Sequence, residues 1–323
     1  MNWVLLRNSL WVAGLTTLLA LNFGVLSALW VSGLQVRCRN LVFGIAAVAF
    51  ALPPFLVTNC WIHYLGFAGV WKGWLPFNIF SLAGTVWILA LLLWPITLFF
   101  SWSAWQKLEA AQLEIDPALA RWRLVCHLLL PLARGPLAQA AVLTFVLALN
   151  AFAVPAILQV KVFPAEIWIQ FSTTFDTARA LRLSWPLLFS FLLLLFLFRT
   201  RPVPWPRVQG ALPPSLFRRQ LGAGWFWCCG GFAMGLCLLS VGLPLFQLLA
   251  LKRTWIELPG ALAAGKAALW NSASFAAGSA SIIIGLSLIF AGGTPGHRRG
   301  VAAFVGRLCW LPCFRQGSWS ESF

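Results

Sequence analysis

Charged side chains are scarce in this 323-residue sequence: they make up 9% of it, and only seven are acidic. A water-soluble domain of this length needs far more charged and polar surface, so a soluble fold is excluded. Hydrophobic residues account for 61%, and the mean hydropathy is +0.86. Six stretches contain no Asp, Glu, Lys or Arg: residues 8–36, 40–71, 73–106, 135–160, 220–251 and 267–296. Each exceeds the roughly 20 residues that a helix needs to cross a bilayer. The composition predicts an all-α, polytopic membrane helix bundle.

Residues that usually perform catalysis or bind metals are also few. The three histidines, His63, His127 and His297, are far apart, and there is no HExxH or GxSxG motif. None of the eight cysteines forms a CxxC pair, and four lie in or beside apolar stretches, which is typical of packing residues. We therefore expect no catalytic residue, no metal site and no cofactor. Residues 260–266 fit the first seven positions of a P-loop, but Ala267 stands where a magnesium-binding Ser or Thr is needed, and no strand precedes them.

The net charge of +16 comes from basic residues that are spread over the loops, without the dense basic tract or aromatic-basic module of a nucleic-acid-binding protein. Thirteen Lys and Arg lie in one set of loops, at residues 34–39, 102–135, 199–222 and 293–300. The alternate loops, residues 62–76, 159–184 and 251–269, hold seven. The positive-inside rule makes the first set cytoplasmic, which puts residue 1 outside the cell. A cleavable signal peptide over residues 1–30 is the alternative, and it would put the basic loops outside.

The apolar stretches and their turn signals predict about seven to eight spanning helices. We expect them at about residues 8–33, 40–61, 77–102, 137–158, 183–198, 222–251, 270–292 and from 301 onward. Pro53 and Pro54 should kink the second of these, as membrane helices tolerate where neighbours or water satisfy the freed carbonyls. The Pro- and Arg-rich residues 199–220 are typical of a linker.

The two ends of the chain share a pattern that predicts an internal duplication. Asn8-Ser9, at the opening of an apolar helix, recurs as Asn271-Ser272, and each copy is followed by a basic loop and a helix that carries Leu-Pro. After its Leu-Pro the second copy turns polar, where the first copy stays apolar. We therefore expect a first repeat at residues 1–200, a cytoplasmic linker at 201–222 and an incomplete second repeat at 223–323, with a first helix missing at the start.

The loop at residues 102–135 holds three of the seven acidic residues. At i, i+3, i+7 spacing, Leu108, Ala111 and Ile115 share one face of a helix, which leaves Glu109 and Gln112 for contact with a partner. Small side chains at positions 110 and 111 allow another surface to come close. The sequence predicts that this helix protrudes on the cytoplasmic side.

A second helix of the loop is predicted after Asp116-Pro117. Asp is a favourable N-cap residue, and Pro is favourable at the first helical position. The helix should run to about Leu129 and end at Pro131. The loop is therefore predicted to be a helix–turn–helix.

The stretch EAAQLEIDPALARWRLVCHLLLPLARGPL resembles the EAA loop of permease subunits of binding-protein-dependent ABC importers. The following FVLALNAFAVPAILQVKVFPAEIWIQF is similar to the members that import iron(III), thiamine or related solutes. The segments LLRNSLWVAGLTTLLAL and ALPPF resemble the first core helices of the same family. The likeness covers about residues 3–200 and, more loosely, 223–312, as in a fused two-permease chain.

The resemblance implies an ABC importer permease fold and a transporter subunit rather than an enzyme, with ATP hydrolysed by a separate chain. In that family the loop docks into a cleft of the ATP-binding subunit. Glu109, Ala110 and Ala111 match the EAA triplet, and Leu130 and Pro131 match its closing Leu-Pro. The turn glycine of the family is not found, and Ile115 or Asp116 stands near its place. The predicted coupling residues are Glu109, Ala110, Ala111, Asp116, Pro117, Leu130 and Pro131.

The implied partners are a cytoplasmic ABC ATPase dimer and an extracytoplasmic substrate-binding protein, with a second permease chain as a further option. The implied location is the bacterial inner membrane, where the chain contacts the lipid bilayer, and nucleic acid is not an expected partner. Polar or kinked positions of the spans are predicted to line the solute pathway: Pro53, Pro54, Asn150 and Pro155. In other membrane proteins, an Asn more often bridges helices and a Pro more often sets a kink.

Two other classes of membrane protein compete with the permease interpretation. An ion-coupled secondary transporter usually needs ionisable residues at membrane depth, and the apolar runs have none, although a sodium site made of backbone carbonyls stays open. A membrane-embedded enzyme would need catalytic motifs that the sequence lacks.

Overall fold

The computed structural model describes residues 3–75, 77–106, 108, 120–174, 184–185, 187–189, 192 and 213–291. Every regular element in these residues is helical. Five of their helices are long and apolar enough to cross a membrane, or six if the bent pair α2–α3 is one span. This confirms the predicted all-α, polytopic helix bundle. The spans expected at 183–198 and from 301 lie largely or wholly outside the described residues.

The chain divides into two compact units, Met1–Leu194 with Val203–Gln247, and Leu195–Pro202 with Leu248–Phe323. The described helices of the first unit are α1 (Trp3–Ser32), α2 (Val36–Ala51), α3 (Pro54–Leu65), α4 (Leu82–Trp105), α6 (Trp122–Leu124), the π-helical turn η1 (Val125–Leu129), α7 (Leu130–Asn150), α8 (Ala153–Ile157), α9 (Phe163–Thr174), α11 (Pro214–Leu221), α12 (Ala223–Cys237) and η2 (Leu238–Gly242). Helix α13 (Leu243–Ala250) crosses the boundary, and α14 (Lys252–Ala291) belongs to the second unit.

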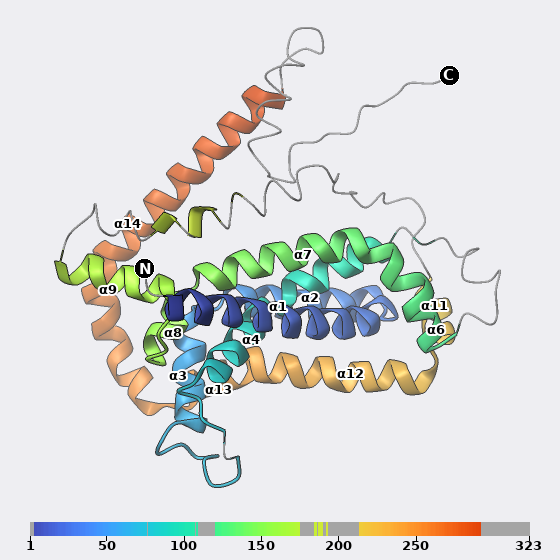
Figure 1. Ribbon diagram of the computed structural model, residues 1–323, viewed down its shortest axis with the longest axis horizontal. Helices are drawn as coiled ribbons and strands as arrows, with labels where there is room; N and C mark the ends of the chain where they lie inside the picture. The colour runs from blue at the N-terminus through green and yellow to red at the C-terminus, as the bar shows by residue number, and fades with distance from the viewer. Residues whose placement is uncertain are drawn as a thin grey trace. The chain divides into compact units, whose positions relative to one another are not determined.

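Helix α1 is central to the first unit, where it packs against α4, α7 and α12 (Figure 1). Its buried face consists mostly of small residues at three- and four-residue spacing, including Ala13, Thr16, Ala20, Gly24, Ser27 and Ala28. Small side chains let helix backbones approach closely in a membrane. At Gly24 an added Cβ would overlap the Cβ of Thr97 and lie 2.7 Å from the backbone nitrogen of Leu98. The contact between α1 and α4 therefore leaves no room for a side chain at position 24.

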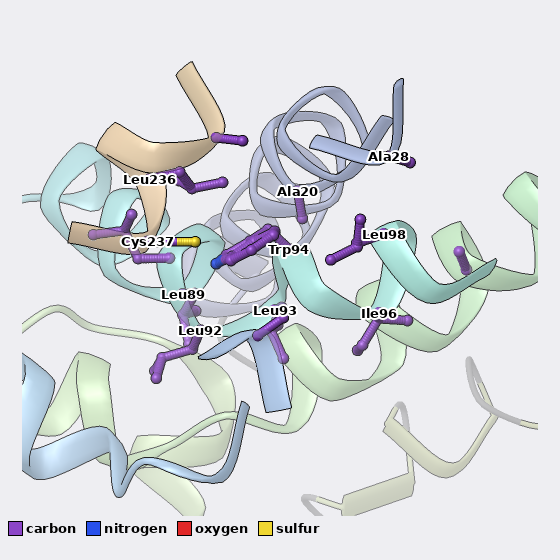
Figure 2. Packing of buried hydrophobic residues seen from close by; sticks show 14 of the residues in the cluster. Ala20, Ala28, Leu89, Leu92, Leu93, Trp94, Ile96, Leu98, Leu236 and Cys237 are labelled. Atoms are coloured by element: carbon purple, nitrogen blue, oxygen red, sulfur yellow. The ribbon is translucent and has the colours of Figure 1, made fainter. Parts of the chain in front are cut away.

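A tryptophan fills the core beside this small-residue face. Trp94 of α4 is fully inaccessible to solvent. Figure 2 shows its ring near Leu236 and Cys237 of α12 and Ala20 of α1, all within one buried cluster. Cys237 therefore packs as an apolar residue, as the sequence predicted.

The proline pair divides the expected second span more sharply than a kink. Helices α2 and α3 meet at an angle of 91°. Leu52 has φ −60° and ψ 133°, and Pro53 has φ −58° and ψ 129°. Because a proline drives the residue before it into extended conformation, two successive prolines place both residues outside the helix. In place of the expected kinked helix from 40 to 61 there are thus two helices, α2 and α3, which together are long and apolar enough to form one bent span.

Helix α14 begins well before the expected start near Trp270. It is 40 residues long, starts at Lys252 and continues through Pro259. The residues after Pro259 are rich in alanine and leucine, which favour helix more strongly than the scattered polar residues oppose it. The P-loop-like residues 260–266 are consequently helical, and their backbone N–H groups are oriented along a helix rather than around a phosphate.

Candidate functional site

The described chain flanks the predicted coupling loop on both sides. Helix α4 ends at Trp105, Leu108 is described alone, and the chain continues from Ala120 into α6. The predicted coupling residues Glu109, Ala110, Ala111, Asp116 and Pro117 lie outside the described residues, so their roles stay predictions. Leu130 and Pro131 are described and form the start of α7.

The two ends of the loop are joined by a buried hydrogen bond. The indole Nε1 of Trp105 donates to the backbone oxygen of Leu129 at 3.0 Å. Both residues are completely buried. The bond connects the last residue of α4 with the residue that precedes the Leu130-Pro131 pair, so the ends of α4 and α7 are held together.

A π-helical turn leads into Pro131, where the sequence predicted the end of a helix. The chain runs from Trp122 through η1 and α7 without a break, so that expectation is wrong. The N–H of Leu130 donates to the oxygen of Val125, five residues back. Pro131 has no N–H, and its ring clashes with the carbonyl four residues earlier in a regular α-helix. The wider π-turn changes the register before the proline and lets the helix continue.

Apolar side chains fill the base of the loop. They come from α4, from the single residue 108, from α6 and η1, and from α11: Trp105, Leu108, Leu124, Leu129, Phe217 and Leu221. Figure 1 shows α6 and α11 at the same end of the first unit, where the two helices are in contact. The described residues on either side of the loop therefore form a buried, packed base.

The predicted pathway residues are placed at two neighbouring breaks. Pro53 and Pro54 are exposed at the bend between α2 and α3, and Pro155 is buried in α8, which packs against α3 and α4. Asn150 is exposed, and its Nδ2 donates to the oxygen of Val146 in its own helix at 2.8 Å. Asn150 thus does not bridge helices through this bond. A role of these residues in a pathway stays a prediction.

Sequence reasoning missed a polar connection at the start of α1. The Oγ of Ser9 accepts a hydrogen bond from the backbone nitrogen of Phe163 at 2.8 Å and donates to the oxygen of Leu5 at 2.9 Å. Next to it, Nδ2 of Asn8 donates to the oxygen of Lys161 at 3.1 Å. These bonds fix the start of α9 on α1. The Asn-Ser pair was visible in the sequence as a repeated motif. No sequence pattern indicated that it bonds to residues about 150 positions away along the chain.

No protein-family model matches the chain. Over 178 residues it is 28% identical to a probable molybdenum ABC transporter permease protein of Haloferax volcanii. The aligned residues make up 53% of this chain and 65% of that protein. The chain thus spans less than two thirds of the length of the curated relative that it matches. The likeness supports an ABC transporter permease in general, and with it a multi-pass membrane protein that is a transporter subunit rather than an enzyme. It gives no support to the iron(III) or thiamine type in particular.

Proposed function

We propose that the chain is the permease component of an ATP-driven importer, and that a separate ATP-binding subunit drives it through the loop at residues 102–135. The observation that carries the proposal is the similarity to an ABC transporter permease. It is supported by the EAA and Leu-Pro pattern of a polar loop that connects two apolar helices, α4 and α7. The ATPase is a dimer of another chain on the cytoplasmic side.

In this proposal, movement of the loop is transmitted to the bundle through the ends of α4 and α7, which are held together. Because Trp105 is bonded to Leu129, a displacement of the loop moves the ends of α4 and α7 together. Helix α1 packs against both, so the three helices follow as one body. Closure of the ATPase dimer shifts the bundle between inward-open and outward-open states, because its contacts with the loop differ between the two. Glu109 supplies the charge at this contact, and Ala110 and Ala111 allow close approach.

The solute that we propose is small and is delivered by an extracytoplasmic binding protein to a permease in the bacterial inner membrane. The resemblance of residues 145–171 favours iron(III), thiamine or a similar solute. The name of the curated relative favours a molybdenum-containing solute as a second candidate. We propose that the pathway runs past Pro53, Pro54, Asn150 and Pro155. A second permease chain supplies a further coupling loop. Uptake of labelled iron(III), thiamine and molybdate by cells with and without the chain distinguishes these solutes.

Co-purification from membranes tests the coupling. A tagged chain should bring down an ATP-binding subunit, and Glu109→Lys should abolish this capture because it reverses the charge at the contact. Glu257→Lys is the matched control: it makes the same charge reversal in α14, outside the loop, and should leave the capture unchanged. A wild-type chain that purifies without an ATPase, and whose uptake follows an ion gradient, would contradict the proposal and favour a secondary transporter.

A further inference from the structure

We infer that α11 is the positioning element of the loop at residues 102–135: it holds both ends of the loop and joins them to α12. The inference rests on the proposed function for one point, that this loop is where an ATP-binding subunit pushes. The contacts of α11 do not depend on that function, because they are all made by residues that the structure describes. The sequence predicted only a linker in this region.

The end of the loop that follows α4 packs against α11. The ring of Trp105 is stacked on that of Phe217, with centroids 6.5 Å apart and an angle of 30° between the planes. Both side chains are completely buried, and Leu108, three residues further along the chain, is 1% exposed. Removal of the Phe217 ring would therefore leave Trp105 without its stacking partner and open a void at the base of the loop.

The other end of the loop is fixed to α11 through its backbone. The N–H of Arg121 donates to the oxygen of Gln220, next to the last residue of α11, at 3.0 Å. Arg121 has φ 54° and ψ −127°. A residue with a side chain keeps such a conformation only where its surroundings impose it. Trp122 then stacks on Trp225 of α12, with centroids 6.0 Å apart and planes 23° from parallel.

Helix α11 is joined to α12 by a single residue. Gly222 has φ 83°, a left-handed conformation, and its N–H donates to the oxygen of Arg218 while its own oxygen accepts from the N–H of Phe226. The guanidinium of Arg218 lies over the rings of Phe226 and Trp227, at 4.9 and 5.3 Å from their centroids. Cation–π contacts of this kind add to the fixation of the two helices.

A displacement of the loop therefore reaches two parts of the bundle. One route is the joined ends of α4 and α7, and the other is α11 and α12, which pack on each other while α12 packs on α1. Where α12 packs on α1 the helices are close: an added Cβ at Gly230 of α12 would lie 2.6 Å from Nε1 of Trp30 of α1. A packed base transmits the movement, whereas a loose base would absorb it in the loop.

Trypsin cleavage after Lys107, in the purified full-length chain in nanodiscs, tests the positioning without any ATPase. With Phe217→Ala, cleavage should be at least about tenfold faster, because the base of the loop opens more often. Phe217→Leu keeps an apolar side chain and should restore most of the protection. The matched control is Phe163→Ala, which removes an equally buried ring from α9, at the other end of the first unit. It should leave the cleavage rate at Lys107 unchanged.

Leu221→Ala is a second, milder variant, in case Phe217→Ala does not fold: it removes a smaller buried side chain of α11 from the base of the loop, and should also speed the cleavage. An unchanged rate in both variants, or an equal acceleration in the Phe163→Ala control, would overturn the inference.

The coupling itself is measured with the ATP-binding subunit that co-purifies with the wild-type chain. Phe217→Ala should retain the capture of this subunit. The amount of labelled iron(III), thiamine or molybdate, whichever the wild-type chain takes up, should fall at least about fivefold per ATP hydrolysed. A normal ratio would overturn the inference even if the loop is cleaved faster. If no ATP-binding subunit is captured at all, the proposed function fails, and the cleavage experiment alone still decides whether α11 positions the loop.

Discussion

Replacement of Gly24 by alanine should force α1 away from α4. The new Cβ would overlap the Cβ of Thr97 and lie 2.7 Å from the backbone nitrogen of Leu98. Overpacking of this kind costs about 1–3 kcal/mol. Gly14 of the same helix is the matched control, because a Cβ there would meet no atom within 4 Å. Both substitutions gain the same intrinsic helix preference, roughly 0.5–1 kcal/mol. The difference between the two variants therefore isolates the packing cost, about 1–3 kcal/mol.

The assay is unfolding of the purified chain by increasing SDS in mixed micelles. Thiol-reactive dye reports the exposure of the buried Cys60, Cys229 and Cys237. Gly24→Ala should shift the transition to less SDS than Gly14→Ala. Addition of Thr97→Ser, which removes one methyl group, should rescue only part of the loss, because the Cβ of residue 97 and the backbone nitrogen of Leu98 stay in the way. Equal transitions for the two alanine variants would refute the close contact of α1 and α4.

Three further substitutions test single contacts. Trp105→Phe should lower the free energy of unfolding by about 1–3 kcal/mol, because the carbonyl of Leu129 loses its buried partner; an unchanged SDS transition would contradict that bond. Ser9→Ala leaves the N–H of Phe163 without its acceptor, so hydrogen exchange of this amide should become faster, and an unchanged rate would count against the connection between α1 and α9. Gly222→Ala places a side chain in the left-handed region and should cost about 1–2 kcal/mol. The same SDS titration measures it, and full stability would mean that α11 and α12 are joined differently.

The sequence predicts the spans well where one physical effect dominates. Long apolar runs between charged loops mark α1, α4 and α12, because the bilayer excludes charge. The junction at Pro53 and the start of α14 were harder. At each of them the helix preference of some residues is opposed by a proline or by polar residues. The outcome is hard to predict because helix propensities differ by only small free energies per residue.

Helix α11 had local signals that composition obscured. Pro214 stands at its first turn, Phe217 and Leu221 are spaced four residues apart, and Gly222 follows its end, which is a favourable pattern for a short amphipathic helix. The Pro- and Arg-rich surroundings made the region resemble a linker. By contrast, the bonds of Trp105 to Leu129 and of Ser9 to Phe163 depend on how distant segments meet, which no local pattern encodes.

The side of the membrane on which the loop lies is the most direct test of the proposed contact with an ATP-binding subunit. Gln112→Cys is introduced into a variant whose eight native cysteines are replaced. A membrane-impermeant maleimide is then added to intact cells and, separately, to inside-out vesicles. We predict labelling in the vesicles only, because the loop faces the cytoplasm. Labelling in intact cells would place the loop outside and contradict its role as the contact for an ATP-binding subunit.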